Sequence, residues 1–562
     1  MRDKNLIHTY RLLDADIARC DSWLKGGGED DDDAQGFIPT LAARPAAETK
    51  LQGLKARLND LPEPDPVFTL VKAHMTDYFQ AMEAGLAARY TQPGRLIGGA
   101  MWMYEFLYSQ DSRTQDVRAQ KVLETLSGAP ALFAAMDEWL DTVSPFRLME
   151  ALGAARSNVV VFTRYASQVD EHFPGLDGAV AEALKLGLTG FADLNAGIIP
   201  KLEALLKDAE MPAETTDDSI LRMDPAEYAA VLMNEHGVEL SELLDWHEAE
   251  IEKTRAAALR IANALDIPET PVTTMGEVNA ILLKYAGPAG TAEEMLARGR
   301  DYIRRTAAAA KDFVWMPEET CNVVTVPEII KISYPWGGYG GGCHRRRPLI
   351  GEMFLNNYNF KAVTDGWIKM NTVHEAYPGH HVQFVRTTVD PIPETLKRGA
   401  KHTPITEGTP HRSEELFEFV FPEDPFYPLF VAYRRHHTAV RIKADLMLRY
   451  FGNPIKEVVQ LYMDEMDFDR GTARGQVAAQ ETMLGYFTTY YYGYKLLSQW
   501  EREYTFDKKQ YTELLFSAGR MSLQNFKRFL DLTDEQRHSF THDFASLIQF
   551  NEDYTEKPIK AD

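Results

Sequence analysis

The chain has 562 residues, 45% of them hydrophobic, and a formal net charge of −23. A chain of this length buries a large core and suggests roughly two to four domains, while its negative charge repels phosphate backbones and excludes nucleic acid as an expected partner. We expect no membrane partner either, because no stretch approaches the roughly 18 apolar residues of a spanning helix.

The three cysteines, Cys20, Cys321 and Cys343, show no paired spacing. A disulfide framework is therefore not indicated, and a reducing compartment fits. Residues 1–20 have neither the apolar core nor the cleavage site of a signal peptide. We expect a cytoplasmic protein, and the sequence leaves its oligomeric state open.

Residues 1–315 are predicted to be almost entirely helical. Apolar residues recur at helical spacing in 46–61, 65–90, 118–126, 145–169, 176–207, 225–234 and 240–265. Pro200 is expected to kink or split the fifth of these helices. The polar, acidic run at 26–33 predicts a solvated loop.

Residues 316–562 add a small sheet to further helices. Short β-branched runs predict strands at 322–326, 329–333 and 351–356, and the glycine-rich run 337–342 predicts a flexible flap or a plain connection. Helices are predicted at 363–386, 414–421, 425–450, 454–464, 474–499 and 508–516. The expected fold is mainly α with a small β-sheet, in which 1–315 and 316–562 pack as one continuous body.

The pair His374-Glu375 lies in the first of these later helices. In metal-dependent hydrolases the histidine of such a pair holds the metal, and the adjacent carboxylate takes a proton from the attacking water. A second histidine usually follows four residues on, but here that position is Pro378. On an ideal helix His380 lies about 120° from the face of His374, and His381 lies close to that face but roughly 10 Å farther along the axis.

Pro378 changes this geometry. It cannot bond the carbonyl of His374 four residues back, and its ring clashes there, so the helix is expected to kink or break. Gly379 permits an unusual backbone conformation at the same point. A bulge here would swing His380, or alternatively His381, towards the metal.

A third ligand is expected from the segment 406–415. Catalytic zinc sites use three protein ligands and leave a fourth position for water. Glu407 is the first choice and Glu414 the alternate, although a plain surface charge explains Glu414 equally well. We therefore predict one zinc ion per chain, held by His374, His380 and Glu407, with Glu375 as the general base.

The pattern His-Glu-x-x-Pro-Gly-His-His at 374–381 resembles the signature of the domain of unknown function 885 family of bacterial proteins. The family's Glu-Gly-Trp-Ala is matched by Glu407-Gly408 but departs at Thr409-Pro410, and its Tyr-x-x-Gly resembles residues 490–493. The resemblance is strongest over about residues 350–500. It implies a zincin-like, gluzincin-like helical metallopeptidase architecture with a recessed cleft, and it leaves the substrate open.

Other side chains are candidates for contact with the substrate. Tyr490 could donate to the developing oxyanion, although tyrosines in a helical run often only pack. His344 and Arg346 belong to a basic run in which an arginine could pair with a substrate carboxylate, and a solvated basic turn explains that run equally. Asn356 lies in a segment, 354–357, that could form an edge strand and bind an extended substrate by β-augmentation.

These residues predict a zinc-dependent hydrolase that cleaves short peptides. One alternative is a non-catalytic helical binding protein with a decayed metal site, which the Thr409-Pro410 departure favours slightly. The other is a metal-dependent hydrolase of a non-peptide amide or ester, because the same activated water serves all these reactions.

Overall fold

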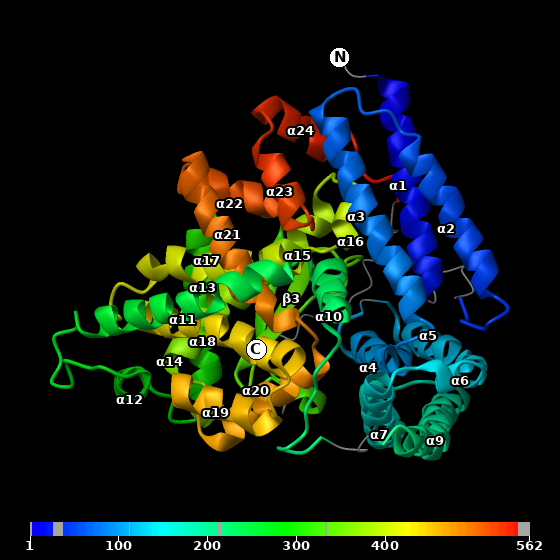
Figure 1. The fold of residues 1–562 in the computed structure, drawn as a ribbon, viewed down its shortest axis with the longest axis horizontal. Coiled ribbons are helices and arrows are strands. Elements are labelled where there is room, and N and C mark those ends of the chain that lie inside the picture. Colours follow the sequence, from blue (N-terminus) through cyan, green and yellow to red (C-terminus); the bar gives the residue numbers. More distant parts are fainter. Residues whose placement is uncertain (1–2, 26–36, 112, 211–214, 332–333, 549–562) are drawn as a thin grey trace.

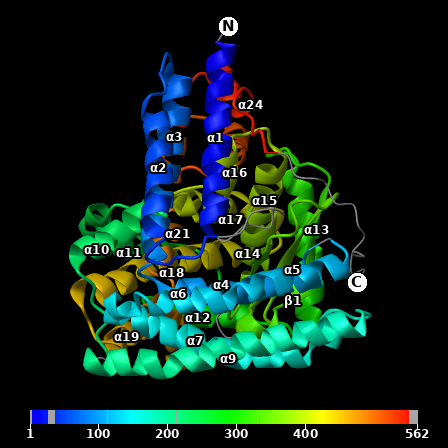
Figure 2. The ribbon, with the colours of Figure 1, turned by 90° about the vertical axis from the view of Figure 1, so that its right-hand side faces the viewer.

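The computed structural model describes residues 3–25, 37–111, 113–210, 215–331 and 334–548. The acidic run predicted as a loop at 26–33 lies outside these ranges. The upright helices in Figure 2 are α1 (Lys4–Lys25), α2 (Arg44–Asn59) and α3 (Pro66–Ala88). Below them run α4 (Pro93–Ser109), α5 (Gln115–Ser127), α6 (Ala129–Asp137), α7 (Pro145–Ser167) and α9 (Gly178–Asp208). The short α8 (Val169–His172) joins the last two.

The predicted N-terminal helices correspond to α2, α3, α5, α7 and α9. Their starts follow capping chemistry, since Asp65 accepts the backbone N–H groups of Val67 and Phe68 and is followed by Pro66 at the first position of α3. Pro200 was expected to kink or split the fifth helix, and it does not split it, because α9 runs through this residue as one helix.

A second helical group leads to the sheet. It comprises α10 (Pro225–Val231), the π-helix η2 (Leu232–His236), α11 (Leu240–Ala262), α12 (Met275–Tyr285) and α13 (Ala292–Ala310). No separate bounds were predicted for α13, which buries Met295, Gly299, Ile303, Thr306 and Ala310 on one face. A Cβ on Gly299 would lie 3.0 Å from the Leu355 side chain, so the missing side chain of Gly299 lets α13 pack closely on the sheet.

The sheet has three strands in the order β1-β3-β2. β1 (Glu319–Thr325) pairs in parallel with β3 (Leu349–Leu355), and β2 (Gly337–Gly340) pairs antiparallel with β3 on its other side. The glycine-rich run expected as a flap therefore forms an edge strand. The strand predicted at 329–333 was wrong where it is described, since Glu328–Ile330 is a 3₁₀ turn. The predicted edge strand at 354–357 was also wrong, because β3 is central.

The remaining helices surround the sheet and close the molecule (Figure 1). They are α14 (Asp365–Asn371), α15 (His380–Val389), α16 (Glu394–Arg398), α17 (Thr403–Leu416), α18 (Tyr427–Leu446), α19 (Ile455–Met466), α20 (Arg470–Thr482), α21 (Thr489–Tyr504), α22 (Lys508–Ser517), α23 (Leu523–Leu530) and α24 (Asp534–His542). The helix predicted at 414–421 is instead the last residues of α17 followed by a 3₁₀ turn at Glu418–Val420, and the one predicted at 474–499 is two helices separated at 483–488.

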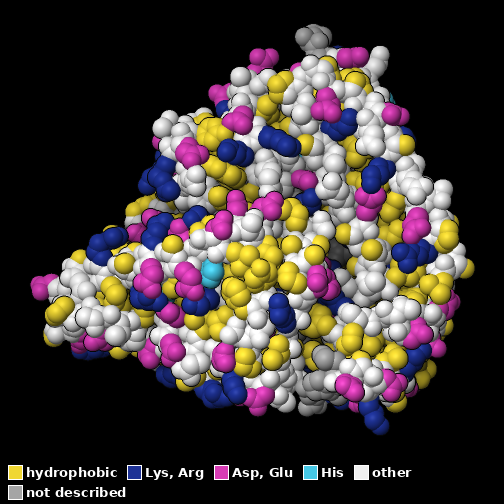
Figure 3. Space-filling view, viewed as in Figure 1, with side chains coloured by type: hydrophobic (Ala, Val, Ile, Leu, Met, Phe, Trp, Pro, Cys, Tyr) yellow, Lys and Arg dark blue, Asp and Glu magenta, His cyan; other side chains and the backbone are white. Residues whose placement is uncertain are grey.

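One apolar cluster extends from Tyr10 to Phe544, so both parts of the chain contribute to the same core. Acidic and basic side chains are interspersed over the face shown in Figure 3. None of the helices in the described part of the chain is both long enough and apolar enough to cross a membrane.

Candidate metal centre

The helix predicted at 363–386 is interrupted where the sequence indicated. α14 ends at Asn371, a π-helix (η5) spans Thr372–Ala376, and α15 begins at His380. The N–H of Tyr377 bonds the carbonyl of Thr372, five residues back, which adds one residue to the turn that holds His374. Such π-turns often occur at functional sites. The predicted bulge is therefore confirmed.

Gly379 makes the sharp return of the chain possible. A Cβ at this position would lie 1.9 Å from the carbonyl oxygen of His374, so no other residue fits. The close return brings His380 beside His374, with ring centroids 4.9 Å apart and ring planes at 86°. Two histidines that a straight helix would separate thus face one another.

Two glycines bring α21 against α17. A Cβ on Gly493 would lie 1.8 Å from the carbonyl oxygen of Pro404, and a Cβ on Gly408 would lie 2.5 Å from the carbonyl carbon of Gly493. The two helix backbones are consequently in direct contact. This contact holds Tyr490 of α21, and Tyr486 just before that helix, on the side of Glu407.

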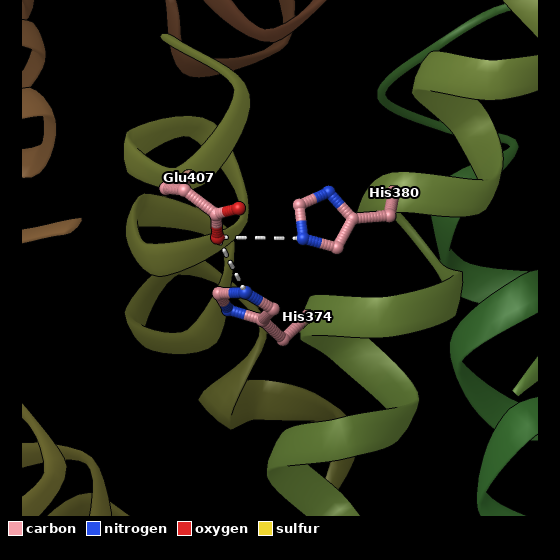
Figure 4. Close-up of side chains that lie close together, drawn as sticks. All are labelled: His374, His380 and Glu407. Carbon is pink, nitrogen blue, oxygen red and sulfur yellow. Dashed lines mark ion pairs between the residues drawn. The ribbon is translucent and has the colours of Figure 1, made fainter. Parts of the chain in front are cut away.

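His374, His380 and Glu407 converge as Figure 4 shows. Glu407 Oε2 lies 3.4 Å from His374 Nε2 and 3.4 Å from His380 Nε2. Two ligand atoms each about 2.0–2.1 Å from a tetrahedral zinc ion lie about 3.3–3.4 Å apart. The spacing therefore suits a tetrahedral ion, and these are the three residues that the sequence predicted to come together.

An oxygen of Glu407 without a hydrogen-bond partner is a second sign that these three side chains suit a metal ion. The Oε2 atom is buried and has no hydrogen-bond partner among the described residues, although Oε1 accepts a 2.5 Å hydrogen bond from the Tyr486 hydroxyl. Burial of an unpartnered carboxylate oxygen is costly. A bound cation would satisfy it.

The electrostatics of the three groups are consistent with a cation site. Burial lowers the pKa of His374, but the nearby carboxylates of Glu407 and Glu414 outweigh this effect and raise the pKa to about 10. The charge of Glu407 also raises the pKa of His380 against the effect of burial. Burial favours the neutral form of Glu407, yet His380 and His374 together hold its pKa well below the usual range. The surroundings of the three side chains therefore favour positive charge at this point, as a cation site requires.

Each histidine is oriented by a partner on its other ring nitrogen. His374 Nδ1 lies 2.7 Å from Glu414 Oε1, and His380 Nδ1 lies 2.9 Å from Gln383 Oε1. If each Nδ1 carries the proton, both Nε2 lone pairs point at the site, the arrangement seen around metal-ligating histidines. Glu414, the alternate ligand, therefore supports His374 from behind, where His411 Nδ1 also lies 3.0 Å from its carboxylate.

Pro410 completes the support of His380. A proline inside α17 has no N–H to donate to the carbonyl of Thr406, four residues back. That freed carbonyl accepts a 3.0 Å hydrogen bond from Gln383 Nε2, and Gln383 in turn contacts His380. The Thr409-Pro410 departure from the family pattern therefore has a structural use at the site.

His381, the other alternate, points elsewhere. It is fully buried, with Nε2 2.6 Å from Glu319 Oε2 and Nδ1 3.0 Å from the Tyr339 hydroxyl. Tyr377 donates to the same Glu319 oxygen at 2.5 Å. These contacts bind the segment around residues 377–381 to β1 and β2 and so hold the start of α15 in place.

Glu375 lies on the open side of the cluster. Its Oε2 atom is 4.0 Å from His380 Nε2, and the two side chains are 13% and 16% exposed, whereas those of His374 and Glu407 are 3% and 4% exposed. An entering molecule therefore meets Glu375 and His380 first.

The predicted Tyr490 is close to the cluster but does not touch a ligand atom directly. Its ring stacks on His374 with centroids 6.0 Å apart, and its hydroxyl donates to that of Tyr486 at 3.1 Å. Tyr486, which bonds Glu407, was missed by sequence reasoning. Its spacing of four residues before Tyr490, on the same helical face, was the available signal. Tyr491 and Tyr492 instead bond carboxylates of α11.

The other predicted substrate contacts fare differently. Asn356 is fully buried, donates to the carbonyls of Lys331 and Tyr334, and accepts two backbone N–H groups, so its role is structural and the prediction was wrong. His344 and Arg346 lie in the turn between β2 and β3. Burial lowers the pKa of Arg346, while the nearby Cys343 and Glu352 raise it. Substrate contact by this turn stays a prediction.

Comparisons with known proteins agree on family and fold. The model of a family described as bacterial protein of unknown function (DUF885) matches residues 7–529. A crystal structure of a candidate lipoprotein from Colwellia psychrerythraea is similar, with a TM-score of 0.72 and 15% identity over 94% of this chain and 99% of that one. A candidate lipoprotein of unknown function from Shewanella oneidensis gives a TM-score of 0.71 and 15% identity over 95% and 100%. No curated protein matches the chain. At such low identity these structures show a shared fold alone.

Proposed function

Since the chain belongs to the DUF885 family of bacterial proteins of unknown function, we propose from its site that it is a zinc-dependent hydrolase that cleaves peptide bonds in short peptides. One observation carries this proposal. Two imidazole nitrogens lie 3.4 Å from a buried, unpartnered carboxylate oxygen, with a further carboxylate, Glu375, on the open side. His374, His380 and Glu407 would hold the ion, in a zincin-like arrangement with three protein ligands and one open position.

The residues around the ion divide the proposed reaction between them. A zinc ion at this position would polarise the scissile carbonyl and lower the pKa of a bound water to about 7. Glu375 takes the proton from the attacking water and returns it to the leaving amine. The Tyr490 hydroxyl, which donates a hydrogen bond to Tyr486 in the absence of substrate, donates to the developing oxyanion instead. Glu414 and Gln383 keep both imidazoles aimed at the ion.

The limited exposure of the site favours short substrates. With Glu375 and His380 only 13% and 16% exposed, a folded protein chain cannot bring its backbone to the cluster, whereas a short extended peptide can. We include the recessed cleft and a cytoplasmic location in this proposal.

The two alternatives make different predictions. A binding protein with a decayed site has no need for an intact set of ligands and their supporting hydrogen bonds, and Pro410 no longer favours that reading. A hydrolase of non-peptide amides or esters would use the same residues, so substrate profiling separates it from a peptidase.

Metal content of the purified protein, measured by elemental mass spectrometry, tests the proposal first. We expect about one zinc ion per chain and none in His374→Ala. A peptide library should then be cleaved by the wild type, while Glu375→Gln keeps its zinc and loses cleavage by at least about 100-fold. Absence of metal after incubation with zinc would overturn the proposal, and zinc without peptide cleavage would favour a non-peptide substrate.

A further inference from the structure

Two arginines of α18 converge on the ring that stacks against His374. Arg434 and Arg441 are seven residues apart, which places them on one helical face two turns from each other. Their guanidinium carbons nevertheless lie 5.6 and 5.5 Å from the centroid of the same Tyr490 ring. Both are buried, with only 5% and 6% of their surface exposed.

Only neutral groups tether these guanidinium groups. Arg434 Nη1 lies 3.3 Å from His437 Nδ1, and Arg441 Nη2 donates to Gln476 Oε1 at 2.9 Å. His437 Nε2 lies 3.2 Å from the same Gln476 oxygen. Burial, together with the two arginines, holds the pKa of His437 well below the usual range, so this imidazole is uncharged. Within the described part of the chain neither arginine forms an ion pair with a carboxylate.

Other buried arginines nearby are paired. Arg435, beside Arg434 in the sequence, lies 3.1 Å from Glu415, and Arg412 binds Glu501 through two hydrogen bonds. Two like charges without a counter-ion in the interior are costly. Burial, followed by the charge of Arg434, lowers the pKa of Arg441 to about 10. An anion bound between the two would relieve both effects.

The aromatic surroundings orient the pair for such an anion. The Arg434 guanidinium lies over the Trp367 ring at 5.4 Å, and that of Arg441 lies over Phe487 at 4.6 Å. A guanidinium held beside aromatic rings can still donate two hydrogen bonds to a carboxylate. Nε of Arg434 is buried without a hydrogen-bond partner among the described residues.

The distance to the metal centre suits a peptide. Each guanidinium carbon lies less than 6 Å from the Tyr490 centroid, which lies 6.0 Å from that of His374. Each guanidinium therefore lies at most about 12 Å from the imidazole, a span of three or four extended residues at about 3.3–3.6 Å each. This distance is compatible with one peptide that has a carbonyl at the metal and a carboxylate at the pair.

We propose that Arg434 and Arg441 bind a carboxylate of the substrate and so select anionic peptides. This inference rests on the proposed function for its substrate class. The carboxylate has two possible sources, the free C-terminus or an Asp or Glu side chain close to the cleaved bond.

Calorimetric titration of the zinc-loaded Glu375→Gln protein tests the inference without turnover. The probes are acetyl-trialanine as the free acid, the same peptide as its C-terminal amide, and an amide in which aspartate replaces the last alanine. We expect the free acid to bind at least about tenfold more tightly than the alanine amide. The aspartyl amide recovers this gain only if a side chain is an accepted source.

Further variants of the Glu375→Gln protein test whether Arg434 and Arg441 cause the tighter binding of the free acid. Arg434→Met and Arg441→Met should remove the preference for the carboxylate while zinc content is unchanged. Gln476→Glu places a carboxylate where an amide now accepts from Arg441, so it should raise the melting temperature and remove the preference. If the two arginines had only a structural role, Gln476→Glu would raise the stability of the protein without reducing its affinity for the free acid. Arg435→Met, which removes the same charge from an arginine already paired with Glu415, should keep the preference.

Three results would overturn the inference: equal binding of acid and amides, no binding of any probe, or a preference that survives both Arg→Met changes. Failure of the proposed function looks different. In that case the protein with Glu375 intact cleaves none of the probes, while carboxylate binding still depends on the two arginines.

Discussion

Pro410 and Gln383 act on one imidazole from two helices. Because Pro410 has no N–H, the Thr406 carbonyl is free to accept a hydrogen bond from Gln383 Nε2. The side-chain oxygen of Gln383 in turn contacts His380 Nδ1. We expect Gln383→Ala to weaken zinc binding by about 10–100-fold, as loss of an outer hydrogen bond to a ligating histidine typically does. Competition against a chelating dye measures this. Pro410→Ala restores a donor that competes for Thr406, so its affinity should fall between those of the wild type and Gln383→Ala.

The matched control for this prediction is Gln460→Ala. Gln460 is exposed and bonds only Asp464 on the surface of α19, so its loss should leave the affinity for zinc unchanged. An equal affinity of wild type and Gln383→Ala would show that packing alone orients His380.

At the residue scale, spacing and chemistry identified the ligand set and little beyond it. The proline at the fourth position predicted the interruption that brings His380 round, and a glutamate some thirty residues on predicted the third ligand. Gln383 was missed because its contact with His380 depends on how α15 and α17 pack, which no local pattern encodes. Tyr486 was missed although its spacing from Tyr490 was an available signal. The prediction for Asn356 failed because sequence does not give the order of the strands, and this buried residue directly follows the central strand β3.

Glu465 joins three helices of the body. Both its oxygens accept from Arg255 of α11, at 2.7 and 2.6 Å, and one lies 3.4 Å from His436 of α18. Hydrogen bonding from His436, opposed by burial and aided by Arg255, lowers the pKa of Glu465 to about 2. Because the folded-state pKa is depressed, the stabilisation is present above the unfolded-state value of about 4.5 and is lost as the pH falls towards 2.

We therefore expect Glu465→Gln to lower the free energy of unfolding by about 1–2 kcal/mol at pH 7, after allowance for partial solvent screening. The difference from the wild type should narrow below pH 4.5. Urea unfolding at pH 7, 5 and 4 measures it, with Glu457→Gln as the control because Glu457 is exposed on the same helix. A difference that stays constant over this range would mean that the charge of Glu465 is not what stabilises the contact.

At the element scale, large apolar residues on one face identified several helices but not all of them. α1 and α4 bury large apolar side chains as well, yet no bounds were predicted for them. β2 is a run of three glycines around Tyr339, which carries no periodic signal although its small residues allow close packing. The break at 483–488 was not predicted, although Gly485 lies there with a φ of 68°, and Tyr486 within this break bonds Glu407.

The N-terminal helices and the metal-site half of the molecule are fastened to each other at several points. Asp14 of α1 accepts the backbone N–H groups of Glu394 and Thr395 at the start of α16. Asp77 of α3 accepts hydrogen bonds from Lys401 and Asn525. One apolar cluster runs from the first helix to the last. Without residues 1–315, residues 316–562 would therefore lack much of the surface against which they pack.

We expect a fragment of residues 316–562 expressed alone to show no cooperative unfolding transition in urea and no stoichiometric zinc, because removal of α1, α3, α11 and α13 exposes apolar faces of α16, α24, α18 and β1 at once. Co-expression with residues 1–315 should restore both properties, which separates missing contacts from a fragment that is merely insoluble. A cooperative transition of the isolated fragment, together with about one bound zinc ion, would show instead that the metal centre is an independent domain. The hydrogen bonds of Asp14 and Asp77 would then be contacts between two separately stable units.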